Sequence, residues 1–211
     1  MPQLPPLLFG LILSIYWGRV MRMVYKMRRR GAGNFRPPEK LGRTLRLIWI
    51  PTVCVWIVHP YIVAFADEAG LPRVMRPVYH SAAAGWAAAV VGVAALAATM
   101  VCWNKMGKSW RMGINPDEKT QLIVSGPYAY VRHPIYALSS LLMIATIAAV
   151  PTPVMFLAGA IHLAFLQWES VREEKYLLAH HGQGYADYRR QVGRFIPWPG
   201  RHYRAAQQRV A

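Results

Sequence analysis

The segment 125–136, Ser-Gly-Pro-Tyr-Ala-Tyr-Val-Arg-His-Pro-Ile-Tyr, carries the residues of this chain that are best suited to chemistry. It lies between two long apolar runs, and ionisable side chains such as Arg132 and His133 are uncommon at a membrane edge and often functional there. Pro134 suits the first turn of a helix, so we expect His133 near the N-cap, close to the positive end of the helix dipole. The same residues also fit an anchoring patch, in which arginine binds lipid phosphate and the tyrosines form an aromatic belt.

Acidic residues form a second unusual group. The chain has 9 Asp and Glu residues, and four of them fall within residues 169–187. Glu169 and Glu173 are four positions apart and share one helix face, with Arg172 beside it. A solvated helix face is the common explanation for charges such as Glu173 and Glu174. Their place beside a basic bundle instead indicates a counter-charge for a cationic group.

The cysteines and histidines indicate neither a metal site nor a covalent nucleophile. Cys54 and Cys102 both fall inside apolar runs, as small core residues do. His180 and His181 are adjacent, so on a helix they point to different sides and chelate poorly. His162 lies inside an apolar run, where a core histidine with a hydrogen-bond partner is the common case and a catalytic histidine is the alternative.

The composition indicates a membrane protein. Hydrophobic residues make up 55% of the 211 residues, yet the formal net charge is +16. A soluble nucleic-acid-binding protein can carry such a charge, but it would not also contain several long apolar runs. The combination fits a polytopic membrane protein with basic loops. We expect five transmembrane helices, at about residues 4–24, 45–66, 78–103, 135–150 and 154–168.

The connecting segments add three expectations. Residues 25–45 are basic and contain glycines and prolines, which predicts a loop. The third apolar run is rich in alanine and glycine, and small residues let helices approach closely in lipid, so we expect this helix in the middle of the bundle. The fifth helix is expected to continue out of the membrane as far as Gly182, which ends it before a further short helix.

The lysines and arginines orient the helices. The segments 19–46, 67–78, 104–133 and 151–153 contain ten, two, five and none of them, and the chain from residue 167 onward contains eight. Basic segments therefore alternate, which by the positive-inside rule places the N-terminus outside and the C-terminus in the cytoplasm. Both segments with unusual polar residues then lie on the cytoplasmic side, which we expect to be that of a bacterial inner membrane.

A tight helical hairpin, residues 134–168, is predicted to join these two segments. Each leg has about 15 residues and spans roughly 22 Å at about 1.5 Å per residue, so the chain returns to its starting level. His133 and the residues from Glu169 to Glu173 are therefore expected at similar depth. We expect Tyr128, His133 and Tyr136 to form the membrane-side wall of a pocket, and Glu173 its tail-side wall.

The chain resembles the isoprenylcysteine carboxyl methyltransferase family, and the related membrane phospholipid methyltransferases, over roughly residues 105–200. The matching positions are Gly126, Pro127, Tyr128, Arg132, His133, Pro134, Ile135, Tyr136, Glu173, Glu174, Gly182, Tyr185, Tyr188, Val192 and Pro197. The resemblance implies an S-adenosylmethionine-dependent methyltransferase whose cofactor site is built from both polar segments.

The resemblance also implies which residues form that site. The cofactor-binding positions are Thr120, Gln121, Leu122, Ile123, Tyr128, His133, Pro134, Ile135, Tyr136 and Glu173. Glu173 is the carboxylate for the cofactor's amino group, while His133 or the helix N-terminus at Ile135 supplies donors for its carboxylate. The candidate catalytic residues are Glu169, Arg172 and His162. Isoprenylcysteine enzymes carry an arginine, linked to the substrate, about four residues before the glutamate that matches Glu173. This chain has Glu169 at that position. The difference from the family therefore concerns the methyl acceptor and not the cofactor.

The acceptor is expected to be a lipid, or a prenylated small molecule or peptide, that enters sideways from the membrane. An amine must lose a proton, for which Glu169 or His162 is a candidate, whereas a carboxylate needs no base. The sulfonium methyl is already electrophilic, so the main requirement is alignment, which can supply about 7–11 kcal/mol of the barrier. Neither a metal ion nor a nucleic acid is expected as a partner.

The predicted fold is all-α, a polytopic integral membrane protein with five transmembrane helices and a cytoplasmic C-terminal helical tail. We divide it into an N-terminal three-helix membrane region (1–103), a cofactor-binding catalytic region (104–200) and a basic C-terminal tail (201–211). One alternative is an enzyme similar to the NADPH-dependent sterol reductases, which share an Arg-His-Pro motif; an absorbance change with NADPH would identify it. The other is a non-catalytic membrane scaffold, which predicts no cofactor binding.

Overall fold

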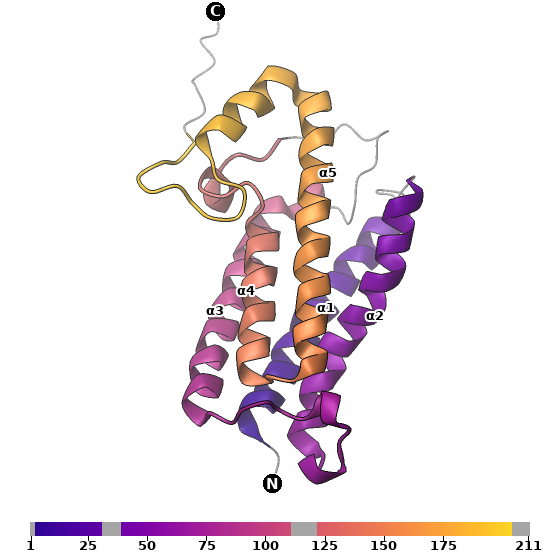
Figure 1. Cartoon of the computed structure of the whole chain (residues 1–211). Coiled ribbons are helices and arrows are strands. Elements are labelled where there is room, and N and C mark those ends of the chain that lie inside the picture. The colour runs from indigo at the N-terminus through magenta and orange to yellow at the C-terminus, as the bar shows by residue number, and fades with distance from the viewer. Residues whose placement is uncertain (1–2, 31–38, 111–121, 204–211) are drawn as a thin grey trace, which may run out of the picture.

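The computed structural model describes residues 3–30, 39–110 and 122–203. Within these residues the secondary-structure elements are helices, and none is a strand. The five α-helices are α1 (Leu4–Arg29), α2 (Lys40–Phe65), α3 (Ala82–Met106), α4 (Pro134–Ala149) and α5 (Pro153–Gln191) (Figure 1). Short 3-10 turns occupy Glu68–Gly70, Arg73–Met75, Gly107–Ser109 and Gly126–Ala129. In the described part of the chain, α1, α2, α3 and α5 are long and apolar enough to cross a membrane, whereas α4 is an apolar helix of 16 residues.

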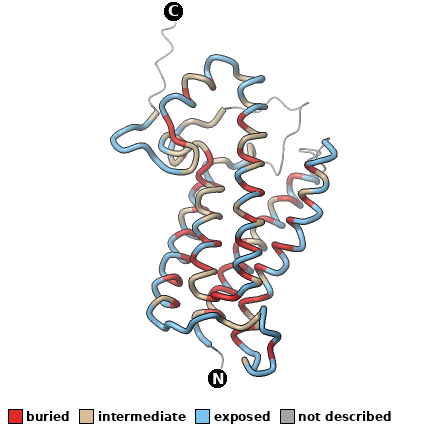
Figure 2. The backbone as a smooth tube through the Cα atoms, in the orientation of Figure 1, coloured by how far each residue is buried: buried red, intermediate tan, exposed pale blue. Residues whose placement is uncertain are grey.

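The bundle is arranged around α4 and α1. Helix α4 contacts α1, α3 and α5, while α2 packs against α1 and α5. The N-terminus, the α2–α3 connection and the α4–α5 turn lie at one end of the bundle, and α5 extends beyond the other end (Figure 1). Buried residues face the inside of the bundle and exposed residues cover its outer faces, which carry many large apolar side chains, as a lipid-facing surface does (Figure 2).

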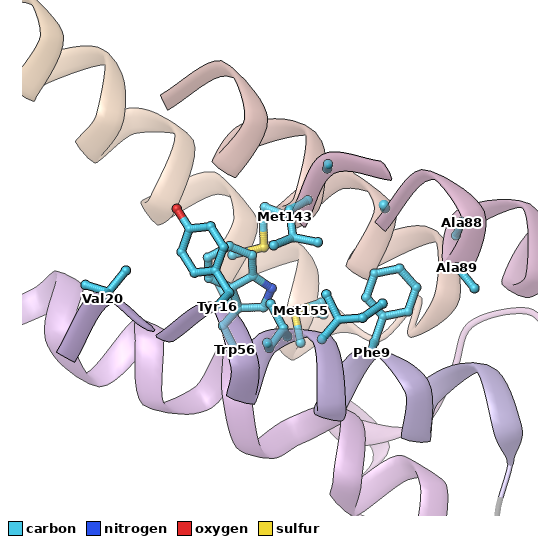
Figure 3. Close-up of a cluster of buried hydrophobic side chains, with 14 of the residues drawn as sticks. Phe9, Tyr16, Val20, Trp56, Ala88, Ala89, Met143 and Met155 are labelled. Carbon is cyan, nitrogen blue, oxygen red and sulfur yellow. The ribbon is translucent and has the colours of Figure 1, made fainter. Parts of the chain in front are cut away.

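The core forms where all five helices meet. Phe9 of α1, Trp56 of α2, Met143 of α4 and Met155 of α5 lie together between the helices, and each is fully buried (Figure 3). The indole nitrogen of Trp56 donates a hydrogen bond of 3.0 Å to Thr146, which satisfies its only polar group inside the apolar core.

Residues 25–45 are not one long loop, and that prediction is wrong at both ends. Helix α1 continues to Arg29 and α2 begins at Lys40, so both ends of the segment are helical. Residues 31–38 lie outside the described residues. Lysine and arginine are good helix formers, and cations in the last turn of α1 complement the negative end of its dipole.

The prediction that the third helix lies in the middle of the bundle is also wrong. The small residues do allow close approach, since a Cβ atom on Gly92 would lie 3.0 Å from the ring of Phe9 in α1. Several of the alanines of α3 are nevertheless exposed, and Trp86, Val90 and Val93 on its outer side are about half exposed or more. Small residues bring α3 against α1 and α4, and its large apolar residues leave it at the edge of the bundle.

The α4–α5 hairpin returns the chain to the end of the bundle from which α4 starts. Pro134 is the first residue of α4 and His133 its N-cap, as predicted, although the His133 side chain makes no capping hydrogen bond. Thr152 caps α5 by accepting a hydrogen bond of 3.1 Å from the backbone of Met155. The helical geometry of α5 is broken at Gly182, where φ is +52° and ψ −127°, which confirms the predicted helix break.

After α5 the chain folds back onto the Arg-His-Pro segment. Val131 and Gly193 form a short parallel bridge, and the backbone N–H groups of Arg132 and His133 donate to the carbonyls of Gly193 (2.9 Å) and Arg194 (3.0 Å). A Cβ atom at Gly193 would lie 2.0 Å from the carbonyl oxygen of Ile196, so only glycine fits there. The tail and the motif, about sixty residues apart in the chain, thus form one structural unit.

Candidate active site

A cavity opens at the end of the bundle where α5 leaves it. Its empty volume is about 900 Å³, part of it open to solvent, and residues of all five helices and of the segment 126–133 line it. Its lining is mainly apolar and aromatic with a few polar and charged groups, which is typical of sites that bind small molecules and cofactors.

Most of the predicted site residues meet in this cavity. Those that line it are Tyr128, His133, Pro134, Ile135, Tyr136, His162, Glu169 and Glu173. Arg172 does not line the cavity but binds Glu169, which does. Leu122 packs instead against the tyrosines of the tail, and Ile123 is not among the lining residues. Thr120 and Gln121 lie outside the described residues.

His133, Tyr136 and Glu173 form the contact between the two walls. The rings of His133 and Tyr136 are stacked, with centroids 5.4 Å apart and planes nearly parallel at 1°. Nδ1 of His133 lies 3.6 Å from Oε2 of Glu173, whose side chain is 34% exposed while that of His133 is only 6% exposed. The carboxylate of Glu173 is therefore the more accessible partner and faces the cavity from the α5 side.

Tyr128 brings an unused hydrogen-bonding group to the cavity. Its hydroxyl is buried and has no hydrogen-bond partner among the described residues, although the residue lines the cavity. Burial raises the pKa of the Tyr128 phenol well above its usual range, so the hydroxyl stays protonated. The backbone carbonyl of Tyr128 accepts a hydrogen bond of 2.5 Å from Tyr188, which fixes this turn against the tail. A buried, protonated and unpartnered donor at a cavity wall is a ligand-binding feature.

Glu174 connects the motif to the tail and does not line the cavity. Arg132 donates to it through Nε (3.0 Å) and Nη2 (2.9 Å), and Arg194 donates through Nε (3.0 Å) and Nη2 (2.9 Å). Nε2 of His133 lies 3.3 Å from the same carboxylate. The carboxylate raises the pKa of the Arg194 guanidinium. Sequence reasoning grouped Glu174 with Glu173 as a possible solvated face, but the structure buries it as an ion-pair centre.

A second ion-pair group closes the cavity on the α2 side. Arg172 binds Glu169 through two hydrogen bonds, of 3.0 and 2.7 Å, and reaches Glu39 at 3.1 Å. Arg46 of α2 lines the cavity and lies 3.4 Å from the same Glu169 carboxylate. Sequence reasoning missed Arg46, which it counted only as one of many basic residues; its place at the start of an apolar run was the available signal.

His162 is held by hydrogen bonds on both ring nitrogens. The indole of Trp49 donates to Nδ1 at 3.1 Å, and Nε2 lies 3.1 Å from the hydroxyl of Ser139. Because Nδ1 accepts, the neutral imidazole carries its proton on Nε2 and donates it to Ser139. The ring is thus a buried link between α2, α4 and α5, and both partners were missed by the sequence analysis.

Aromatic residues of the first three helices and of the turn that follows α3 complete the wall. Tyr16, Trp17, Trp49, Trp103 and Trp110 all line the cavity. Their types gave no motif, since tryptophan and tyrosine are common at membrane interfaces whether or not they face a ligand.

Comparison with known proteins gives the same family as the motif residues. Residues 87–180 match the model of the isoprenylcysteine carboxyl methyltransferase (ICMT) family, which confirms the resemblance. No protein of curated function matches the chain. The matched segment contains most of α3, the Arg-His-Pro segment, α4 and α5 up to its break, and it belongs to that family. With the apolar helices described above, the chain is an integral-membrane methyltransferase.

Proposed function

We propose that this integral-membrane methyltransferase uses S-adenosylmethionine and binds it in the cavity between the Arg-His-Pro segment and α5. One observation supports this most directly: Tyr128, His133 and Tyr136 from one segment and Glu173 from the other line a single cavity. We place this cavity on the cytoplasmic side of the membrane, from which the polar cofactor can enter.

The residues present fit the groups of this cofactor. The accessible carboxylate of Glu173 suits a cationic ammonium, and the unpartnered hydroxyl of Tyr128 suits an acceptor atom of the ligand. Tryptophan and tyrosine rings on the wall can surround a sulfonium, because a cation is attracted to the face of an aromatic ring.

The protein's contribution to the reaction is alignment. When bound, S-adenosylmethionine supplies an electrophilic methyl group, whose transfer breaks the C–S bond and leaves the electron pair on sulfur. The rings of His133 and Tyr136 stack on each other, and Nε2 of His133 lies 3.3 Å from the Glu174 carboxylate, so both side chains are positioned by neighbours in the protein. Alignment of two reactants can supply about 7–11 kcal/mol of the barrier.

We further propose a carboxylate as the acceptor, carried by a lipid or a prenylated molecule. Arg46 lines the cavity beside Glu169, and Phe165 and Leu166 provide an apolar surface next to it. In the resembled family an arginine at the position of Glu169 binds the acceptor. In this chain we assign that role to the guanidinium of Arg46. A carboxylate attacks without a general base, and both nitrogens of His162 are already occupied by hydrogen bonds. We therefore assign His162 a positioning role, and Glu169 and Arg172 the role of orienting Arg46.

Two measurements test the proposal. Calorimetric titration of the chain in detergent with S-adenosylhomocysteine should show one binding site. His133→Ala should abolish methyl transfer in a protein that is still folded, whereas His180→Ala, outside the cavity, should leave the rate unchanged. Full cofactor affinity together with full methyl transfer in His133→Ala would contradict the two-walled site.

The acceptor class is tested by the stability of the product. Labelled S-adenosylmethionine is supplied with a prenylated cysteine carboxylate or with an aminophospholipid. A carboxyl methyl ester releases labelled methanol in alkali, and a methylated amine does not. Alkali-stable label on the aminophospholipid would show that the acceptor is an amine, and the cofactor assignment would stand.

A further inference from the structure

A second hollow, distinct from the cofactor cavity, lies between α1 and the end of α3. Arg19, Arg22, Lys26 and Arg30 line it. The spacing of three and four residues places Arg19, Arg22 and Lys26 on one face of α1, and Arg30 is the C-cap residue of this helix. Its other lining residues are Met23, Met27, Trp103, Asn104, Gly107 and Trp110. The hollow thus combines four positive charges with an apolar and aromatic surface, and we call it the basic groove.

No acidic side chain within residues 3–30, 39–110 and 122–203 forms an ion pair with the four cations. The acidic residues that form ion pairs there do so with other groups: Glu39, Glu68, Glu169, Glu173, Glu174 and Asp187. Nε of Arg19 is in addition buried without a hydrogen-bond partner among the described residues. A buried donor without a partner in the protein requires an acceptor from a ligand. The positive-inside rule explains why basic residues lie on one side of the membrane, but it does not explain why they line a hollow.

The basic groove lies beside the cofactor cavity. Trp103 and Trp110 line both hollows, and the indole nitrogen of Trp103 is buried without a hydrogen-bond partner in the described part of the chain. A ligand there needs acceptor oxygens with several negative charges, and an apolar part that contacts Met23 and Met27. A membrane lipid with a multiply charged phosphate headgroup meets both requirements, since basic pockets between transmembrane helices bind such headgroups.

We propose that the basic groove is a specific binding site for a membrane lipid whose headgroup carries two phosphate charges. Arg19 and Arg22 are further from the C-terminal end of α1 than Lys26 and Arg30, so the four cations form a row along which two phosphates can bind. The lipid chains extend over the apolar residues of the groove. This site is independent of the methyl-transfer reaction, so it is measured without S-adenosylmethionine.

Native mass spectrometry of the full chain, released from detergent micelles, tests the site. The probes are tetraoleoyl cardiolipin, with two phosphates, and dioleoyl phosphatidylglycerol, with one. We expect one cardiolipin per chain, bound in clear preference to phosphatidylglycerol. The double variant Arg22→Gln, Lys26→Gln should weaken cardiolipin binding roughly thirtyfold, because each cation contributes about 1 kcal/mol and about 1.4 kcal/mol is tenfold.

The control is the double variant Arg28→Gln, Lys40→Gln, which removes the same charge at the same end of the bundle but outside the groove. It should retain cardiolipin like the unchanged chain. Equal loss in both double variants, or equal binding of the two lipids, would reduce the groove to a diffuse basic surface and overturn the proposal. Displacement of cardiolipin by an equal concentration of inorganic pyrophosphate would also overturn it, because the site would then select a soluble anion.

Discussion

Glu173 and Glu174 are adjacent, yet the structure predicts opposite consequences for their replacement. Glu174→Gln keeps the size of the side chain and removes its charge. Oε1 of Glu174 accepts from both Arg132 and Arg194, and Oε2 accepts from Arg194 alone. In a glutamine an NH₂ group replaces one of these oxygens, so it points a donor at a guanidinium donor. The four charge-assisted hydrogen bonds from Arg132 and Arg194 cannot all be kept.

The size of the effect follows from the burial of the two arginines. Removing one partner of a buried ion pair costs about 3–5 kcal/mol. The lower end applies here, because the Arg194 side chain is 31% exposed and Arg132 keeps two backbone carbonyls of the tail as acceptors. We expect Glu174→Gln to cost about 3 kcal/mol, mostly as local opening of the tail away from the Arg-His-Pro segment.

Hydrogen exchange in detergent measures this local opening. Backbone amides of residues 131–133 and 192–194 should exchange more than about a hundredfold faster in Glu174→Gln, since every 1.4 kcal/mol is tenfold. Amides in the buried parts of α1 and α4 should be unchanged. The control is Asp187→Asn, which removes an exposed acid from the same helix and should cost under about 1 kcal/mol. Unchanged exchange at the bridge in Glu174→Gln would refute the structural role assigned to this carboxylate.

Three further predictions concern the cofactor, the fold of the tail and the topology. Glu173→Gln should weaken S-adenosylhomocysteine binding by roughly 1.5–3 kcal/mol, which is the value of a hydrogen bond to a charged group, and should leave hydrogen exchange unchanged. Unaltered affinity in calorimetry would mean that Glu173 belongs to a solvated helix face. Gly193→Ala should destabilise the tail by about 1–3 kcal/mol in urea titration, because the added Cβ would lie 2.0 Å from the carbonyl oxygen of Ile196. An unfolding midpoint equal to that of the unchanged chain would contradict this prediction. A reporter enzyme active only outside the cytoplasm should give signal when fused after Asp67, and signal after Ala211 would overturn the predicted orientation.

The helices and their ends were largely predictable, because they depend on local sequence. The apolar runs of the sequence gave most of each α-helix, and four of the five helices are long and apolar enough to cross a membrane in the described part of the chain. Pro134 at the first position of α4 and Gly182 at the break in α5 were predicted from backbone preferences that a residue carries wherever it lies. The error at residues 25–45 arose because basic composition was taken as a loop, although lysine and arginine also extend helices.

The site was predictable only in part. The hairpin argument brought His133 and Glu173 to one level, because two helical legs of similar length return the chain to its start. It could not assign separate roles to Glu173 and Glu174. Which of two adjacent helical residues faces a cavity, and which faces the folded tail, depends on the rotation of α5 against its neighbours.

The sequence by itself determined an all-helical membrane protein, the match of residues 87–180 to a methyltransferase family and the motif segment that lies at the cavity. Only the tertiary structure decided the partners of that segment: Arg46 beside Glu169, which is 123 residues away, Trp49 on His162, and the tail folded onto Arg132. The physical reason is that helix formation and hydropathy act over a few residues, whereas these contacts depend on how five helices pack together. That packing is set by the sum of many small apolar contacts, and no single stretch of sequence contains it.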